Sequence, residues 1–115
     1  MNQGIDCRTS IVQALHLLSS PDAQLAYEHD VPAVNVLDEV VATWFDDTYL
    51  PDAEPFKEFF SGAELKAMAK FSRYFEERIN HLPPTASGVG VWLKDENWQR
   101  IMQEARDLLV ALQAG

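Results

Sequence analysis

Acidic side chains beside large aromatic ones are the feature of this sequence that most suggests chemistry. Four carboxylates and a tyrosine stand close together in the first half of the chain: Asp38, Glu39, Asp46, Asp47 and Tyr49. Carboxylates attract the basic groups of a protein partner, and aromatic side chains are frequent anchors of protein interfaces. We therefore predict that these five residues contact a partner and that the partner is a basic protein.

The same carboxylates raise the question of acid–base catalysis. Adjacent helical residues point about 100° apart, so Asp46 and Asp47 cannot share a proton while the helix continues. The sequence has no GxSxG nucleophile elbow, and its Gly88-Val89-Gly90 segment lacks the third glycine and the Lys-Ser/Thr of phosphate-binding loops. We predict that the protein is not an enzyme and uses no cofactor.

Histidines and carboxylates together suggest testing the sequence for a metal site. It contains no HExxH, and no glutamate stands three positions before His16, His29 or His81, as the Glu-x-x-His pairs of di-iron bundles require. No metal ligand is predicted. A metal-dependent enzyme stays open as an alternative, and its ligands would be Glu28, His29, Glu77 and His81.

The formal charge of -9 lies entirely in the first half of the chain. Up to Phe60, two basic residues stand against eleven acids, and two minus eleven gives -9; from Ser61 onward, seven bases balance seven acids. This negative charge disfavours binding to nucleic acid and to anionic membranes, which requires Lys and Arg. Lys66, Lys70 and Arg73 form a basic stripe that could neutralise part of the acidic half across the fold.

Helices must position these residues, because apolar side chains recur at steps of three and four. Caps are predicted at Ser20, at Asn35 and at Ser61, where Ser61 and Glu64 form a capping box. The predicted helices cover about residues 6–18, 21–30, 35–48, 61–82 and 95–112, with one aromatic turn at 56–60. Thr9 offers a later start for the first helix, and Pro32 an earlier start for the third. Most of Trp44, Phe45, Phe59 and Phe60 should be buried, and Tyr27 and Tyr49 partly exposed.

This pattern predicts an all-α fold: one compact, bundle-like domain over residues 1–115, with five to six helices around a single core. Residues 84–94 should form an irregular, glycine-containing loop, because a single strand would have no ladder partner. In the last helix, Arg100 should pair with Glu104. No apolar run is long enough for a membrane span, and the lone Cys7 predicts a cytoplasmic protein without disulfides.

The general character of the chain, small and acidic with no catalytic motif, is similar to that of immunity proteins that neutralise nuclease toxins. An immunity- or antitoxin-like inhibitor is therefore the concrete form of the main prediction, although no motif places the chain in such a family. The first alternative is a structural or regulatory homodimer that uses Trp92, Trp98 and the charge-neutral C-terminal helix, so monomer and homodimer both stay open. A DNA mimic is a minor further alternative.

Overall fold

Helices account for most of the described chain, which comprises residues 3–31 and 35–114 of a computed structural model. Seven α-helices occur in this part, five of them with at least seven residues, and it contains no strand, which confirms the all-α prediction. None of these helices is both long and apolar enough to cross a membrane. In chain order the elements are α1 (Gln3–Ser19), α2 (Pro21–Asp30), α3 (Val36–Ala42), the π-helix η1 (Thr43–Thr48), α4 (Glu54–Glu58), α5 (Gly62–Ile79), the 3-10 helix η2 (Thr85–Ser87), α6 (Val89–Lys94) and α7 (Glu96–Ala114).

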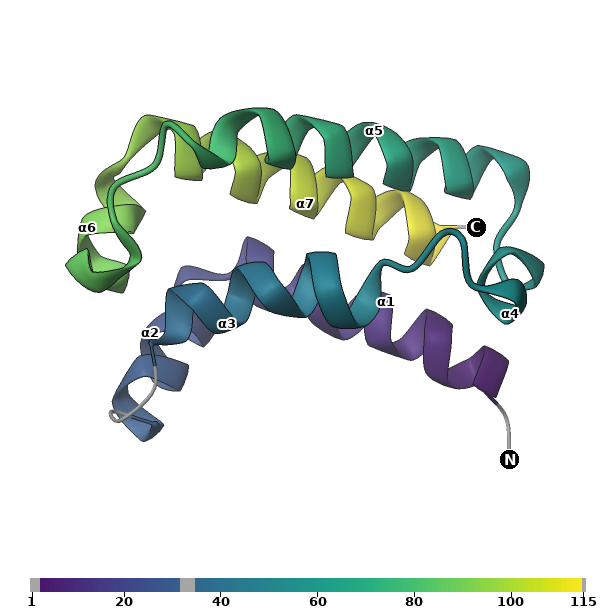
Figure 1. The fold of residues 1–115 in the computed structure, drawn as a ribbon, viewed down its shortest axis with the longest axis horizontal. Helices are drawn as coiled ribbons and strands as arrows, with labels where there is room; N and C mark the ends of the chain where they lie inside the picture. Colours follow the sequence, from purple (N-terminus) through teal and green to yellow (C-terminus); the bar gives the residue numbers. More distant parts are fainter. Residues whose placement is uncertain (1–2, 32–34, 115) are drawn as a thin grey trace.

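The long helices form two layers (Figure 1). In one layer α5 and α7 pack side by side, and in the other α1 lies with α3 and η1. The layers meet chiefly where α1 packs on α7. At one end of the molecule α2 contacts α6, and at the other α4 contacts α1. This arrangement sets the acidic segment of α3 and η1 opposite the second half of α5.

Side-chain caps explain where several helices begin. Ser20, Asn35 and Asp95 each accept a backbone N–H from the residue three positions on. At the start of α5, the Glu64 amide donates to Ser61 Oγ at 3.1 Å and the Ser61 amide donates to Glu64 Oε1 at 2.9 Å. These bonds satisfy amides that have no partner within the helix. The predicted caps and the capping box are confirmed.

Helix boundaries differ from the predictions by a few residues. α1 begins at Gln3, ahead of the predicted start near Asp6. α5 ends at Ile79, earlier than the predicted Leu82, which lies in a turn before two prolines. The alternative start at Pro32 lies outside the described residues.

The core is built around three tryptophans whose exposed fractions are at most 1%. Each indole N–H donates to an acceptor within the chain, in the pairs Trp44 with Ser72, Trp92 with Pro83 and Trp98 with Gln24. Trp92 and Trp98 are therefore buried, and neither can be a main contact of the predicted homodimer interface; a homodimer through the C-terminal helix stays a prediction. Tyr27 and Tyr49 are half-buried, as predicted, and Phe60 is buried, as predicted. Phe45, predicted to be buried, is only half-buried, and Phe59 is exposed.

Residues 84–94 are more ordered than the predicted irregular loop, because they contain η2 and α6. Gly88, which joins the two, has a φ of 93°, a conformation that glycine adopts at little cost. Glu28 of α2 caps α6 from a distance, since its Oε2 accepts the Val89 N–H at 2.9 Å. The short helix then buries Val89 and Trp92. A cap supplied by a residue so far away in sequence cannot be read from the local pattern.

Candidate binding groove

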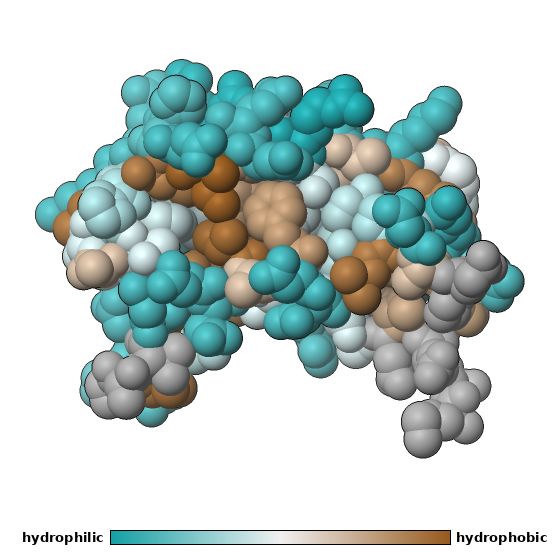
Figure 2. Space-filling view, in the orientation of Figure 1, coloured by the Kyte–Doolittle hydropathy of each residue, from teal (hydrophilic) through white to brown (hydrophobic). Residues whose placement is uncertain are grey.

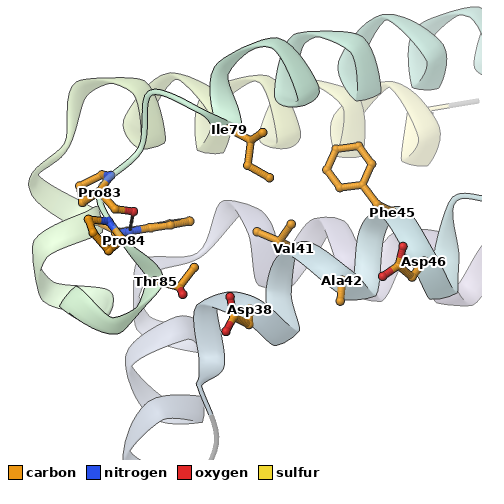
Figure 3. Close-up of a pocket in the computed structure, with 10 residues that line it drawn as sticks. Asp38, Val41, Ala42, Phe45, Asp46, Ile79, Pro83, Pro84 and Thr85 are labelled. Carbon is orange, nitrogen blue, oxygen red and sulfur yellow. Dashed lines mark hydrogen bonds between the residues drawn. The ribbon is translucent and has the colours of Figure 1, made fainter.

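A groove of about 390 Å³ opens between α3 with η1 and the turn that follows α5 (Figure 3). We call it the α3 groove. Among the described residues, its lining comprises Asp38, Val41, Ala42, Phe45, Asp46, Ile79, Pro83, Pro84, Thr85 and Trp92. In Figure 2 the same face of the molecule shows an apolar band between hydrophilic surfaces.

One edge of the α3 groove is acidic. Asp38, Ala42 and Asp46 follow one another at four-residue steps along α3 and η1, which keeps them near one side of the helix. Both aspartates are exposed. Within the described residues, neither carboxylate forms an ion pair with a basic side chain. This edge therefore presents two negative charges that are not neutralised locally.

The floor of the groove is apolar. Figure 3 shows Val41 and Phe45 projecting from α3 and η1 toward α5, and Ile79 projecting from α5 toward them. The ring of Phe45 packs on Phe75 beneath it, with centroids 4.9 Å apart and planes inclined by 48°. Phe45 is only half-buried and lines the groove, and its ring is seen nearly face-on in Figure 3. The floor can accept aliphatic or flat groups.

Prolines and a tryptophan close one end of the groove. The indole N–H of Trp92 donates to the carbonyl of Pro83 at 2.9 Å, which holds the turn after α5 against α6. The Asn35 amide donates to the hydroxyl of Thr85 at 3.1 Å and ties the same turn to the start of α3. These bonds hold both walls of the groove at this end.

The π-helical turn determines where the acidic segment ends. The Tyr49 N–H donates to the Trp44 carbonyl at 2.9 Å, five residues back, and the two rings stack. Burial raises the pKa of the Tyr49 hydroxyl above its ordinary 10.0, and the nearby Asp52 carboxylate raises it further. Tyr49 belongs to this internal stack and does not line the groove.

The structure thus divides the five predicted contact residues. Asp38 and Asp46 both line the α3 groove. Glu39 and Asp47 are exposed on the same helix but do not line it, and Tyr49 is half-buried against the core. The sequence gives no signal for the floor and the far wall of the groove: the spacing of Phe45 and Ile79 is that of core residues, and Pro83 and Thr85 carry no binding motif. Their role depends on which helices become neighbours.

The basic stripe on α5 does not neutralise the acidic segment, contrary to the neutralisation considered above. Lys66, Lys70 and Arg73 are exposed on the outer side of α5, and no ion pair joins them to α3 or η1 in the described part of the chain. The ion pairs of this part are Arg8–Glu64 at 2.7 Å, Arg100–Glu96 at 2.6 Å and His29–Asp30 at 3.3 Å, the last one charged only when the histidine is protonated.

One further prediction about charged residues is wrong, and the alternative of a metal site finds no ligand cluster in the described residues. Arg100 pairs with Glu96, not with Glu104; in this pair the glutamate precedes the basic residue by four, which is the favoured order. The proposed metal ligands are not assembled, because no group of three or more His, Cys, Asp or Glu in the described residues could hold a metal ion. Glu28, one of those ligands, instead caps α6.

The fold and the groove together define an all-α domain with an acid-edged apolar groove. Comparisons with protein families, curated proteins and solved structures found no match for the chain. Chemically, the groove offers carboxylates that attract cations and a floor that accepts apolar groups. Both properties are those of a binding surface.

Proposed function

We propose that the protein is a non-catalytic binding protein whose α3 groove holds a basic segment of a protein partner. The observation that carries this proposal is the position of Asp38 and Asp46 along one edge of an apolar floor, as two exposed carboxylates that have no basic partner among the described residues. A lysine or arginine side chain fits such a site, since its aliphatic stem packs on the floor while its charged end meets the edge.

The surrounding charge favours the same kind of partner. Glu39 and Asp47 add two exposed carboxylates to the helix that carries the groove edge, in a chain whose net charge is -9. Charges outside a contact accelerate the encounter with an oppositely charged protein and contribute less to the lifetime of the complex. The proposal therefore gives the two pairs of acids different roles, Asp38 and Asp46 in affinity and Glu39 and Asp47 in association rate.

An inhibitor of a basic toxin, similar in character to immunity proteins and antitoxins, is the concrete form of this proposal. Such an inhibitor needs a preformed surface that recognises the toxin, and it needs no catalytic groups of its own. The rigid end of the groove, held by the Trp92–Pro83 and Asn35–Thr85 hydrogen bonds, supports a preformed surface.

Affinity purification with matched variants tests the proposal. The wild-type protein, Asp38→Lys/Asp46→Lys and Glu39→Lys/Asp47→Lys serve as baits in a lysate of the source organism. Both variants change the charge of the same helix equally, but only the first alters the groove. We expect one basic protein to be retained by the wild type and the second variant and lost by the first.

Titration calorimetry with the identified protein completes the test. The groove variant should weaken binding at least tenfold, whereas the control variant should change affinity less and mainly slow association, measured by stopped flow. Circular dichroism establishes that each variant remains folded. Equal weakening by the two variants, or none by either, would contradict the proposal.

A further inference from the structure

We propose that the α3 groove recognises arginine in preference to lysine, with the guanidinium stacked on Phe45 and bonded to Asp46. This inference rests on the proposed function and specifies the chemistry of the partner. It follows from three properties of the groove: a partly exposed aromatic ring in its lining, a carboxylate on the neighbouring residue and a second carboxylate two turns away.

The aromatic ring is the first property. The Phe45 ring lines the groove and is partly exposed, and it contacts Phe75 in a tilted arrangement with centroids 4.9 Å apart. A cation above an aromatic ring is attracted by the negative face of the ring, and arginine adds planar stacking that an ammonium group cannot provide. The Phe45 ring should therefore bind a flat guanidinium group more favourably than the ammonium group of a lysine.

The position of Asp46 is the second property. Asp46 follows Phe45 in the chain, lines the same groove and is exposed. A carboxylate accepts two parallel N–H bonds from a guanidinium, but a lysine ammonium meets it as a point charge. A guanidinium on Phe45 can thus turn its edge toward Asp46 while its stem packs on the apolar floor.

The third property is the distance to the second carboxylate. Eight residues separate Asp38 from Asp46, which corresponds to about 12 Å along a helix axis. In an extended peptide, side chains four residues apart lie on one face about 13 Å apart. A partner segment with two arginines at this spacing and an apolar residue midway between them matches both carboxylates and the floor.

Two capped peptides test this inference on the full chain. The probe is acetyl-GRSVSRG-amide, and its matched control, acetyl-GKSVSKG-amide, has the same charge and spacing. Titrations at low salt are followed by ¹H–¹⁵N correlation spectra. We expect shifts concentrated at residues 38–46 and at Thr85, with a Kd about three- to fivefold lower for the arginine peptide, the preference expected of an exposed cation–π contact.

Variants of Phe45 and Asp46 show which side chain causes the preference for the arginine peptide. Phe45→Leu keeps an apolar floor but removes the ring, so it should bind the two peptides equally. Asp46→Asn should weaken both peptides, and Asp47→Asn, an equal charge change outside the groove, should weaken them less. Circular dichroism and the dispersion of the amide spectra show whether Phe45→Leu is folded; if it is not, Phe45→Met provides the second test.

The possible results separate this inference from the proposed function. Equal binding of both peptides at the groove of the wild type, or a preference that survives Phe45→Leu, overturns arginine recognition and leaves the basic-partner proposal intact. Shifts spread over all exposed acids, or a loss of binding in Asp47→Asn as large as that in Asp46→Asn, overturn both. The absence of any shift at the groove also overturns both.

Discussion

The ring of Tyr49 stacks on the ring of Trp44, with centroids 5.1 Å apart and planes only 5° from parallel. The two residues are five positions apart, and the π-helical bond from the Tyr49 N–H to the Trp44 carbonyl brings them to one side of η1. Tyr49 also meets Phe56 of α4 edge-on at 5.8 Å. The stack therefore anchors the end of the helix that carries Asp46 and connects it to α4.

Removal of the Tyr49 ring should destabilise the protein. Tyr49→Ala should lower the free energy of unfolding by about 2–3 kcal/mol, because it removes the stack and leaves part of the Trp44 face uncovered. Tyr49→Phe retains the ring and should cost less than about 1 kcal/mol. Urea unfolding followed by circular dichroism measures both values. Equal losses in the two variants would show that the hydroxyl, and not the stack, stabilises this region.

The hydroxyl of Tyr49 should titrate at higher pH than an ordinary tyrosine. Burial raises its pKa above 10.0, and the Asp52 carboxylate raises it further, so the folded state favours the neutral form. The stabilisation that the folded state gains from holding Tyr49 neutral is fully present below pH 10, and it is lost as the pH rises through the raised pKa. The difference between the ultraviolet titrations of the wild type and Tyr49→Phe isolates this group. Asp52→Asn should move its pKa back toward 10; an unchanged value would exclude the role of Asp52.

Predictions from the sequence succeeded where the cause was local. The capping box of Ser61 and Glu64 lies within four residues, and the buried stripe of α7 follows from its helical period. The α3 groove could not be predicted, because Phe45 and Ile79 become neighbours only when α3 and α5 pack together. Phe45 has the spacing of a core residue, but it is only half-buried because it lines the groove.

The Arg8–Glu64 pair should make stability depend on pH in the acid range. Arg8 donates two bonds to the Glu64 carboxylate, at 2.7 and 3.2 Å, and another to the Leu112 carbonyl at 2.9 Å, which connects α1, α5 and α7. The bonds from Arg8 hold the pKa of Glu64 below its ordinary 4.5. The contribution of the Arg8–Glu64 pair to the free energy of unfolding is therefore present above pH 4.5, and it is lost as the pH falls through the lowered pKa of Glu64.

Glu64→Gln tests this pH dependence. At pH 7 it should lower the free energy of unfolding by about 1 kcal/mol, since a partly exposed ion pair is replaced by neutral hydrogen bonds. The deficit relative to the wild type should shrink when the urea unfolding is repeated below pH 4. Glu76→Gln, an exposed change on the same helix, should show little effect at either pH. A deficit for Glu64→Gln that is the same at both pH values would rule out the pair as its cause.

Two glycines near α6 should respond to alanine in opposite directions. Gly88 has a φ of 93° and a ψ of 163°, so Gly88→Ala should destabilise the protein by about 1–3 kcal/mol through backbone strain. Gly90 lies within α6, and a Cβ added there would meet no atom within 4 Å, so Gly90→Ala should stabilise the protein by up to about 1 kcal/mol. Thermal unfolding distinguishes them by the sign of the change in Tm. A rise for Gly88→Ala would contradict the assigned conformation.

Gln24 should be the most sensitive polar residue of the core. It is fully buried; its side-chain amide donates to the Leu17 and Leu18 carbonyls at 2.9 and 3.3 Å, and its Oε1 accepts the indole N–H of Trp98 at 3.1 Å. Gln24→Leu leaves these groups unsatisfied and should cost about 2–4 kcal/mol in urea unfolding, whereas Gln13→Leu, an exposed change on α1, should cost less than about 0.5 kcal/mol. Trp98→Phe removes the indole N–H that Gln24→Leu leaves without an acceptor. The double variant Gln24→Leu/Trp98→Phe should therefore lose less free energy of unfolding than the sum of the two single losses. Strict additivity would mean that the Gln24–Trp98 bond contributes nothing to stability.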